Sequence, residues 1–435
     1  MYNFFKSFAV YFRPGILHIT LLGIASGLPF SIIFGTLTFW LSENEIKKSE
    51  IGLFALVGLP YVFKFIWSPF VDNLDIKFLT KKLGKRKSWI ILTQTGLFFS
   101  IAALGFANAM YYDIIYIACL ALLVSFVSAT QDIVIDGYRI ECLEEKEQGA
   151  GAAAIVFGWR VGALLSGAGT LFLASEFGWF KAYYITALAF LPIMLYVASI
   201  KEPDHPIKEK GANYKEWIDI TILMPFKEFM TRDKWLLMLL FILLFKLGDA
   251  IALSMLSPFI QDLGYSIDEY ASISKLFGFV ALMSGAMIGG VLIAYVGIIK
   301  GLLISGICQM LSTLCFVWLA NVDHNIPVFA TSIALENFAS GMGTSAFVAF
   351  LSQSCNPKFT ATQYALFSAF ASLGKTLFAA PAGYIVEAYG WELFFLSCSA
   401  LALPGLLLIY GLKIYTKNDF LEKNSNDLAV NKKLS

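Results

Sequence analysis

The sequence predicts an all-α integral membrane protein, and three observations support that prediction. Hydrophobic residues make up 58% of the 435 residues and charged residues 14%, which is more apolar and less charged than a soluble domain. Apolar runs of about 20 residues recur along the chain, and each is long enough to cross a bilayer as a helix. The runs fall into two groups around one long polar connection. We therefore expect about twelve transmembrane helices in two six-helix halves.

The apolar runs define the expected elements in order. In the first group they are 16–40, 51–70, 88–107, 112–135, 150–174 and 182–200. In the second group they are 235–259, 271–296, 301–320, 328–351, 361–386 and 391–414. We accordingly divide the chain into a first half, 1–200, a linker, 201–233, a second half, 234–415, and a tail, 416–435. The start of the chain, 1–14, lacks a small-residue cleavage site and leads into a full-length span, so we expect the first span to act as its own uncleaved insertion signal.

Positive charge is distributed unevenly between the connections. The first connection carries Lys47 and Lys48, whereas the second carries Lys77, Lys81, Lys82, Lys85, Arg86 and Lys87. Basic connections remain on the cytoplasmic side of a membrane. We expect the even-numbered connections, the linker and both termini to be cytoplasmic. Two parallel halves of six spans around a cytoplasmic linker are typical of the major-facilitator architecture.

Charged side chains within the apolar runs are the main functional signal. They are Lys64, Asp132, Asp136, Arg160, Lys246, Asp249, Lys275, Glu336 and Lys375. Each would cost at least roughly 2.5 to 3.5 kcal/mol if it faced lipid, and such charges usually mark a path for a substrate, an ion or a proton. This favours a transporter over an enzyme. The net charge of +1 gives no reason to expect a nucleic-acid partner, and the six scattered cysteines predict no metal site.

Four acids are candidates for proton coupling. Asp132 and Asp136 are four residues apart and share a helix face, where repulsion and burial both favour proton uptake. Alternatively, Asp136 caps the end of its span and pairs with Arg139. Asp249 lies three residues after Lys246, so the two form either a breakable switch or a structural ion pair. Glu336 corresponds loosely to Asp132 in a weak internal repeat.

Cations and their aromatic neighbours are candidates for substrate binding. Arg160 and Lys375 lie deepest in their spans and at matching places in the two halves, so both can hold an anionic group. Trp159 can stack on a sugar ring. Lys64 and Lys275 lie nearer the ends of their spans, where they either face the substrate or extend toward the membrane surface. Lys246 is a further candidate for substrate binding.

A short motif predicts a gate. Asp72 follows the second run, and Gly84-Lys85-Arg86-Lys87 precedes the third. This acid-then-basic loop resembles the one that major facilitators carry at this place. Asp72 can lock against helix N-termini of the opposite half, while the basic residues stay at the anionic membrane surface. We assign Asp72 and Arg86 to conformational exchange.

Longer motifs resemble the AmpG-type muropeptide permeases of Gram-negative inner membranes. These motifs are Ser26-Gly27-Leu28-Pro29, the runs 61–69, 131–134 and 147–153, Lys246-Leu247-Gly248-Asp249-Ala250, Glu336-Asn337, 341–349 and 361–366. The resemblance implies a proton-coupled importer of N-acetylglucosaminyl-1,6-anhydro-N-acetylmuramic acid, with or without its peptide. It adds Asn337 and Gln363 to the expected substrate contacts, and implies a monomer in the bacterial inner membrane that needs no cofactor beyond the proton gradient.

Two observations on the sequence keep alternatives open. Lys375 stands where the family pattern often has arginine, which puts bidentate carboxylate binding there in question. Eukaryotic acetyl-CoA transporters share the signature around Asp132, so another anionic metabolite such as acetyl-CoA is the alternative cargo. A sensor that binds its ligand without moving it is the alternative function.

Overall fold

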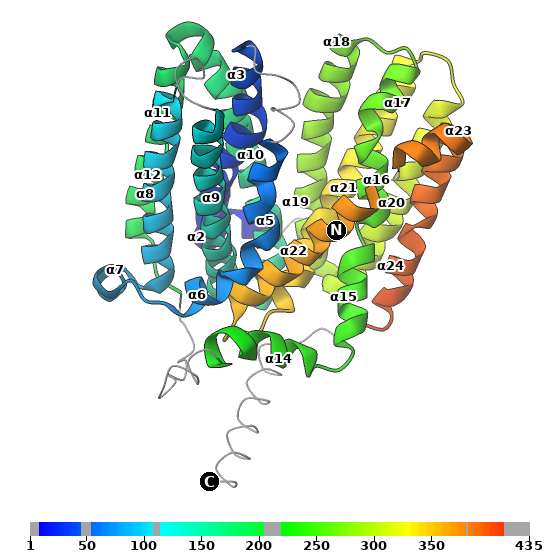
Figure 1. The fold of residues 1–435 in the computed structure, drawn as a ribbon. Coiled ribbons are helices and arrows are strands. Elements are labelled where there is room, and N and C mark those ends of the chain that lie inside the picture. Colours follow the sequence, from blue (N-terminus) through cyan, green and yellow to red (C-terminus); the bar gives the residue numbers. More distant parts are fainter. Residues whose placement is uncertain (1–7, 45–53, 108–113, 204–218, 380–381, 413–435) are drawn as a thin grey trace.

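The structure is a computed structural model, and it describes residues 8–44, 54–107, 114–203, 219–379 and 382–412. Among these residues the regular elements are all helical. Figure 1 shows two bundles side by side, one built from the blue to green-cyan part of the chain and the other from the green to red part. The expected all-α membrane fold is confirmed.

The first bundle begins with η1 (Phe8–Phe12) and a long first span made of α2 (Pro14–Ser31), η2 (Ile32–Thr36) and α3 (Leu37–Glu43). Its second span is broken into η3 (Phe54–Gly58), α5 (Leu59–Phe63), η4 (Lys64–Ile66) and α6 (Ser68–Asn73). There follow α7 (Lys77–Leu83), α8 (Lys85–Phe106), α9 (Ile114–Cys142), η5 (Glu145–Glu147), α10 (Gln148–Phe177), α11 (Trp179–Leu188) and α12 (Phe190–Ser199).

The second bundle is preceded by η6 (Asp219–Leu223) and α14 (Met224–Met230). Its spans are α15 (Trp235–Leu244) with α16 (Leu247–Ser254) and α17 (Leu256–Asp262), then α18 (Ile267–Tyr270) with η7 (Ala271–Phe277) and α19 (Gly278–Val296). The remaining elements are α20 (Ile298–Ala320), α21 (Ile326–Gln353), α22 (Thr360–Ala379), α23 (Ala382–Ala400) and α24 (Ala402–Ile409). Non-helical backbone at Gly390 divides α23, so the last span begins at Trp391.

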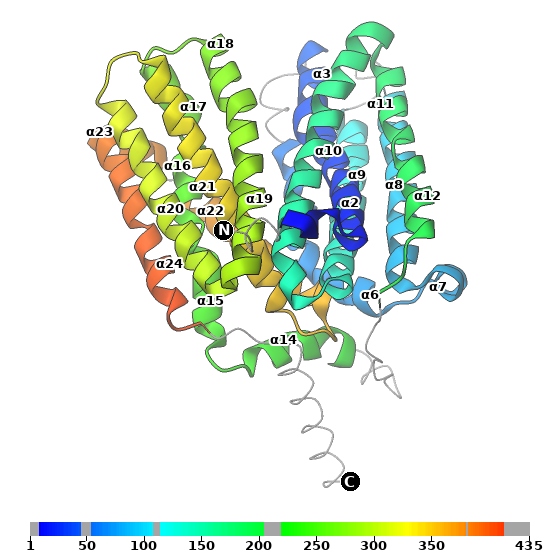
Figure 2. The same ribbon diagram turned by 180° about the vertical axis from the view of Figure 1, so that it is seen from behind.

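Nine helical segments of the described chain are long and apolar enough to cross a membrane. The broken segment 54–73, α21 and α22 run through the same bundles but fall outside that set (Figures 1 and 2). The nine apolar segments and these three together make the twelve spans that the sequence predicts. Several boundaries differ from their predictions by a few residues, and the difference that matters for the site is that α9 continues to Cys142 and carries Asp136 and Glu141 inside the helix. Hydropathy ends this span too early because its last two turns are polar.

Each half contains the same hydrogen bond between the end of its first span and the start of its last span. In the first half the Trp179 indole donates a hydrogen bond to Glu43 at 2.6 Å, and in the second the Trp391 indole donates to Asp262 at 3.0 Å. Each tryptophan follows a glycine with positive φ, 80° at Gly178 and 76° at Gly390. That backbone region favours glycine, and it turns the chain into the last span of each half. The correspondence supports two parallel halves.

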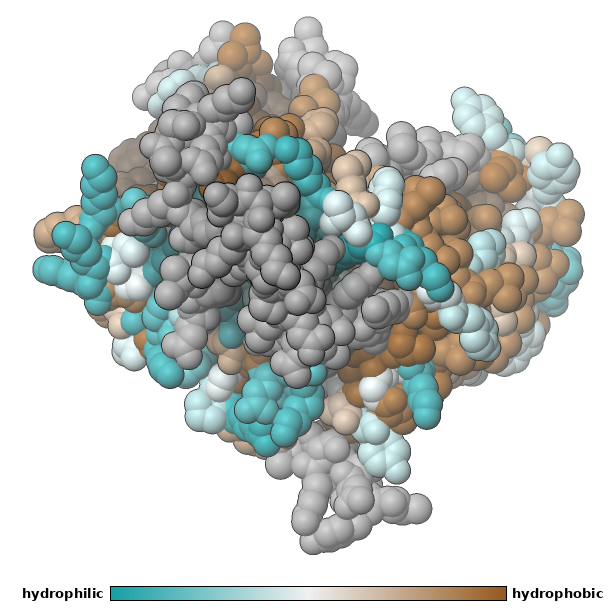
Figure 3. Space-filling model, turned by 90° about the horizontal axis from the view of Figure 1, so that it is seen from below, coloured by the Kyte–Doolittle hydropathy of each residue, from teal (hydrophilic) through white to brown (hydrophobic). Residues whose placement is uncertain are grey.

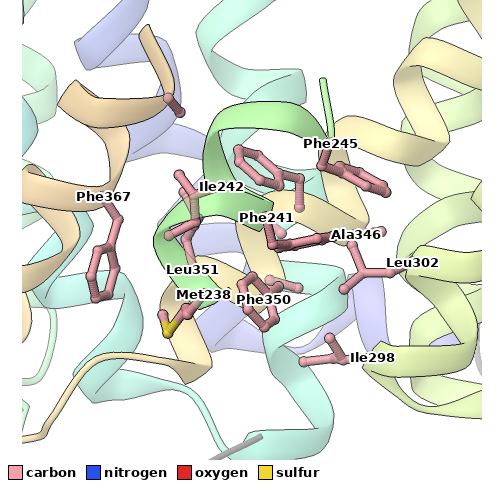
Figure 4. Packing of buried hydrophobic residues seen from close by; sticks show 14 of the residues in the cluster. Met238, Phe241, Ile242, Phe245, Ile298, Leu302, Ala346, Phe350, Leu351 and Phe367 are labelled. Atoms are coloured by element: carbon pink, nitrogen blue, oxygen red, sulfur yellow. The ribbon is translucent and has the colours of Figure 1, made fainter. Parts of the chain in front are cut away.

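We call the opposite end, which carries α7 and α14, the basic end. Figure 3 looks at this end and shows hydrophilic side chains gathered on it, with hydrophobic ones toward the flanks. In the second half, Phe241 of α15 and Phe245, which follows α15, pack against Ala346 and Phe350 of α21 and against Leu302 of α20 (Figure 4). This packing fixes the end of α15, and therefore the position of the next residue, Lys246.

Backbone contact between α2 and α10 positions a second part of the site. A Cβ at Gly27 would lie 2.0 Å from the Trp159 carbonyl oxygen, and one at Gly158 would lie 2.2 Å from the Thr20 carbonyl oxygen. Small residues at such crossings let transmembrane helices approach closely. The crossing brings Trp159 and Arg160 beside the first span.

Candidate functional site

A polar cluster in the first half surrounds Asp132. The Ser26 hydroxyl of α2 donates to Asp132 Oδ1 at 2.5 Å, and the Tyr61 hydroxyl of α5 donates to Ser128 on α9 at 2.8 Å. Lys64 is 8% exposed and lies close enough to Asp132 for electrostatic attraction. The break at η4 places Lys64 here, so its side chain faces the interior of the bundle and does not extend toward the membrane surface.

A second cluster in the second half contains two acids and one cation. Lys246 Nζ lies 2.7 Å from Asp249 Oδ2, and both side chains are buried. The Ser340 hydroxyl donates to the same Asp249 oxygen at 3.1 Å. Lys246 occupies the break between α15 and α16, which places Asp249 in the first turn of α16, where the helix dipole stabilises a carboxylate.

Glu336 completes the second cluster. It is fully buried on α21, and its Oε2 accepts a hydrogen bond from the Ser312 hydroxyl of α20 at 2.6 Å. Its carboxyl group lies near Asp249, because the Ser340 hydroxyl that bonds Asp249 is one helix turn away from Glu336 on α21. Two buried acids thus accompany one cation, and a buried charge without a partner is costly, so the cluster is neutral only when the two acids carry one proton. With that proton, the charges of Lys246, Asp249 and Glu336 sum to zero.

Asp136 takes the structural role that the sequence left open. Arg139 Nη2 lies 3.3 Å from Asp136 Oδ1, while Arg139 Nη1 donates to Ser352 of α21 at 2.7 Å. The Arg139 guanidinium also stacks 5.0 Å from the centre of the Tyr364 ring. Asp136 therefore holds an arginine that joins the two halves, which favours the structural alternative for this residue, while its part in proton coupling stays a prediction.

The basic end is closed by a buried network around Arg86. Arg86 Nη2 lies 2.7 Å from Asp72 Oδ1 and 2.5 Å from Glu141 Oε1, and it donates to Thr360 of the second half at 3.2 Å. Glu141 also accepts a hydrogen bond from the Thr360 hydroxyl. Glu141 is absent from the sequence-based set, although an acid two residues after Arg139 at the polar end of α9 is the signal that points to it.

Asp72 meets a helix N-terminus of the opposite half. Its Oδ2 accepts from the backbone N–H of Thr362 and from the Thr362 hydroxyl, both in the first turn of α22. Hydrogen bonds that join the two halves gather at this end, where Thr360, Thr362 and Ser352 of the second half bond to Arg86, Asp72, Glu141 and Arg139 of the first. The basic end is therefore closed in this conformation.

The structure corrects the position of Gln363, which was expected to contact substrate. Its Oε1 accepts from Arg232 at 2.8 Å and from the backbone N–H of Asn356 at 2.8 Å. Its Nε2 donates to Glu228 at 2.7 Å and to the Pro225 carbonyl at 3.0 Å. These partners use both ends of the buried amide, so Gln363 ties α14 to α22.

The remaining expected contacts are distributed differently. Arg160 is exposed, and its guanidinium lies 5.2 Å from the centre of the Trp159 ring. Trp159 packs at 5.0 Å against Phe30, which packs at 6.0 Å against Tyr61 of the first cluster. Asn337 donates to the Ile333 carbonyl of its own helix at 3.0 Å. The side chains of Lys275 and Lys375 lie outside the described residues.

Comparisons with known proteins add independent findings. The family model of the Major Facilitator Superfamily matches residues 19–377. The chain is 37% identical over 402 residues to the anhydromuropeptide permease of Escherichia coli strain K12, covering 92% of this chain and 80% of that protein. It is 38% identical over 398 residues to putative transporter AmpG 4 of Rickettsia conorii, with 91% and 95% covered. For putative transporter AmpG 3 of Rickettsia prowazekii the identity is 34% over 426 residues, with 94% and 99% covered.

Among solved structures, the human organic anion transporter MFSD10 (TETRAN) matches with a TM-score of 0.71 and 14% sequence identity. The match covers 91% of this chain and 100% of that chain. At this identity the likeness shows the fold alone.

Proposed function

The chain belongs to the major facilitator superfamily and, within it, to the AmpG family of transporters, and we propose that it imports anhydromuropeptides together with protons. The proposed cargo is N-acetylglucosaminyl-1,6-anhydro-N-acetylmuramic acid with or without its peptide. The name of the Escherichia coli relative supports this cargo class.

The observation that carries the proton-coupled part is the burial of two acids, Asp249 and Glu336, in one cluster with a single cation, Lys246. When only one of the two acids is protonated, the other balances the lysine. A second proton neutralises both acids and leaves the lysine charge without a partner, so Lys246 attracts an anionic cargo. Loss of that proton restores the pair and releases the cargo. Proton binding and cargo binding therefore favour each other in this scheme.

Features of the first half support the proposed cargo contact. Arg160 presents an exposed cation against the face of Trp159. A cation beside an aromatic face suits a carboxylated sugar, because the ring stacks on the sugar while the guanidinium binds the carboxylate. Lys375 is proposed as the matching cation of the second half on sequence grounds alone.

We place the basic end in the bacterial cytoplasm, because basic connections stay on that side of an inner membrane. On this orientation the closed basic end corresponds to a conformation that is sealed from the cytoplasm. Cargo then binds from the periplasmic side, and breakage of the contacts between Asp72 and Thr362 accompanies its release inward. We expect the transporter to act as a monomer.

Uptake by proteoliposomes tests the proposed function. With an acidic exterior, purified protein should accumulate labelled anhydromuropeptide, and an uncoupler should abolish the accumulation. Liposomes without protein provide the background. Competition by acetyl-CoA at equal concentration would instead indicate the alternative cargo. Binding of the muropeptide without any accumulation or exchange would indicate a sensor and overturn the proposal.

A further inference from the structure

A small cavity inside the second half lies beside Asp249. It lies between α16, α20, α23 and α24 and leaves about 10 Å³ for the centre of a water-sized sphere. One buried water molecule needs about that much room. Most of the wall is apolar, formed by residues such as Phe245, Met310 and Leu406, and three side chains make it polar: Asp249, Gln309 and Thr313.

Gln309 is the residue of this wall whose buried amide group lacks the hydrogen bonds that it needs. It is 4% exposed, and neither its amide oxygen nor its amide nitrogen has a hydrogen-bond partner among the described residues. Each buried polar group without a partner costs roughly 1 to 3 kcal/mol. Its amide group is also packed against α21, where a Cβ on Gly343 would lie 2.0 Å from Gln309 Oε1. A polar molecule in the cavity would satisfy this amide.

The surrounding groups fit a water molecule. Asp249 supplies an acceptor and Gln309 supplies both a donor and an acceptor. The Thr313 hydroxyl donates to the backbone carbonyl oxygen of Gln309 at 3.0 Å, which leaves the Thr313 oxygen as a further acceptor. Buried waters typically make about three hydrogen bonds. A metal ion is disfavoured, because the Lys246 ammonium already lies 2.7 Å from the Asp249 carboxylate.

We propose that Gln309 holds a water molecule against Asp249 and that protons reach the Asp249 and Glu336 carboxyl groups through this water. The relay rests on the proposed proton coupling, whereas the water site does not. In the relay step the protonated water transfers H⁺ to the Asp249 carboxylate and becomes neutral water. Lys246 keeps its charge and loses its partner. The other titratable groups that face this position are Glu336 on α21 and the Cys398 thiol on α23.

Radiolytic labelling in H₂¹⁸O tests the water site without requiring transport. X-ray pulses convert bound water into hydroxyl radicals, which oxidise the nearest side chains. Cys398 lines the cavity and is 2% exposed, while Cys355 is 4% exposed and lies outside that wall, so it is a matched control. We expect several-fold faster labelling of Cys398 than of Cys355 in the wild type. Gln309→Leu should reduce the Cys398 rate to that of Cys355.

Gln94→Leu is the control for replacing a buried glutamine, since the Gln94 amide is also buried without a partner among the described residues but lies in the first half. It should leave Cys398 labelling unchanged. Equal labelling of the two cysteines in the wild type, or an unchanged Cys398 rate in folded Gln309→Leu, would overturn the water site.

The relay has a separate readout. In proteoliposomes, Gln309→Leu should lower proton-driven cargo accumulation by about tenfold or more, which is about 1.4 kcal/mol, while counterflow exchange persists. Wild-type accumulation in this variant would overturn the relay. If the wild type itself neither accumulates nor exchanges cargo, the proposed function and the relay both fail, and labelling still decides the water site.

Discussion

Asp72 of the first half accepts two hydrogen bonds from Thr362 of the second half, at 3.3 Å from the backbone N–H and at 3.1 Å from the hydroxyl. The same carboxylate holds Arg86 through its other oxygen at 2.7 Å. One buried acid thus joins the second span, the first turn of α8 and the N-terminus of α22. The closure of the basic end depends on this residue more directly than on the surface lysines around it.

Thr362→Val should open the basic end more often. The change removes one of the two bonds to Asp72, and a hydrogen bond to a charged group is worth roughly 1.5 to 3 kcal/mol. The ratio of closed to open molecules should fall by about ten- to hundred-fold. Spin labels on α7 and α14 would report the change as a longer distance. Thr362→Ser keeps the hydroxyl and should behave like the wild type, and equal distances in both variants would contradict this role.

Arg160→Gln should weaken muropeptide binding by about ten- to hundred-fold, because a charge-assisted contact is lost. Calorimetric titration of purified protein would measure this. Lys375→Gln is expected to have a similar effect on the basis of its matching position. Unchanged affinity in both folded variants would remove these cations from the cargo site.

Gln363→Leu should destabilise the protein without changing cargo affinity. The change leaves Arg232, Glu228 and the Asn356 N–H without one partner each, and such losses typically cost about 1 to 3 kcal/mol of stability. Thermal unfolding should therefore begin at a lower temperature, while titration gives wild-type binding. Weaker binding at unchanged stability would restore Gln363 to the cargo site.

Glu228 predicts a pH dependence of stability at the basic end. Burial opposes ionisation of this carboxyl, but the hydrogen bonds and charge of Arg232 outweigh burial and hold its pKa below the ordinary value of 4.5. A depressed folded-state pKa gives stability that is fully present above the unfolded pKa and is lost as the pH falls through the folded value. Unfolding temperatures measured across pH 6 to about 3 should therefore fall less steeply in Glu228→Gln than in the wild type.

The sequence predicts the number of spans and the two halves well, because both depend on hydropathy. It also places Asp72 and Arg86 at one end, because charge on the connections fixes which residues lie there. Side-chain direction is not encoded so locally. Gln363 and Lys64 lie in similarly apolar runs, yet one is tied to α14 and the other faces Asp132, and only the packing of distant helices decides this. Glu141 was missed because it lies in the polar last turns of α9, which hydropathy leaves outside the span.

Cargo-dependent proton influx tests the central claim most directly. Proteoliposomes with a trapped pH dye should acidify inside when anhydromuropeptide is added outside at equal starting pH. The double variant Asp249→Asn/Glu336→Gln removes both members of the carboxyl pair, and Asp132→Asn removes the acid of the first-half cluster. Both variants should still exchange cargo, and the double variant should lose acidification because the proposed coupled proton binds that pair. Absence of cargo-dependent acidification in the wild type, or wild-type acidification in the double variant, would contradict the account.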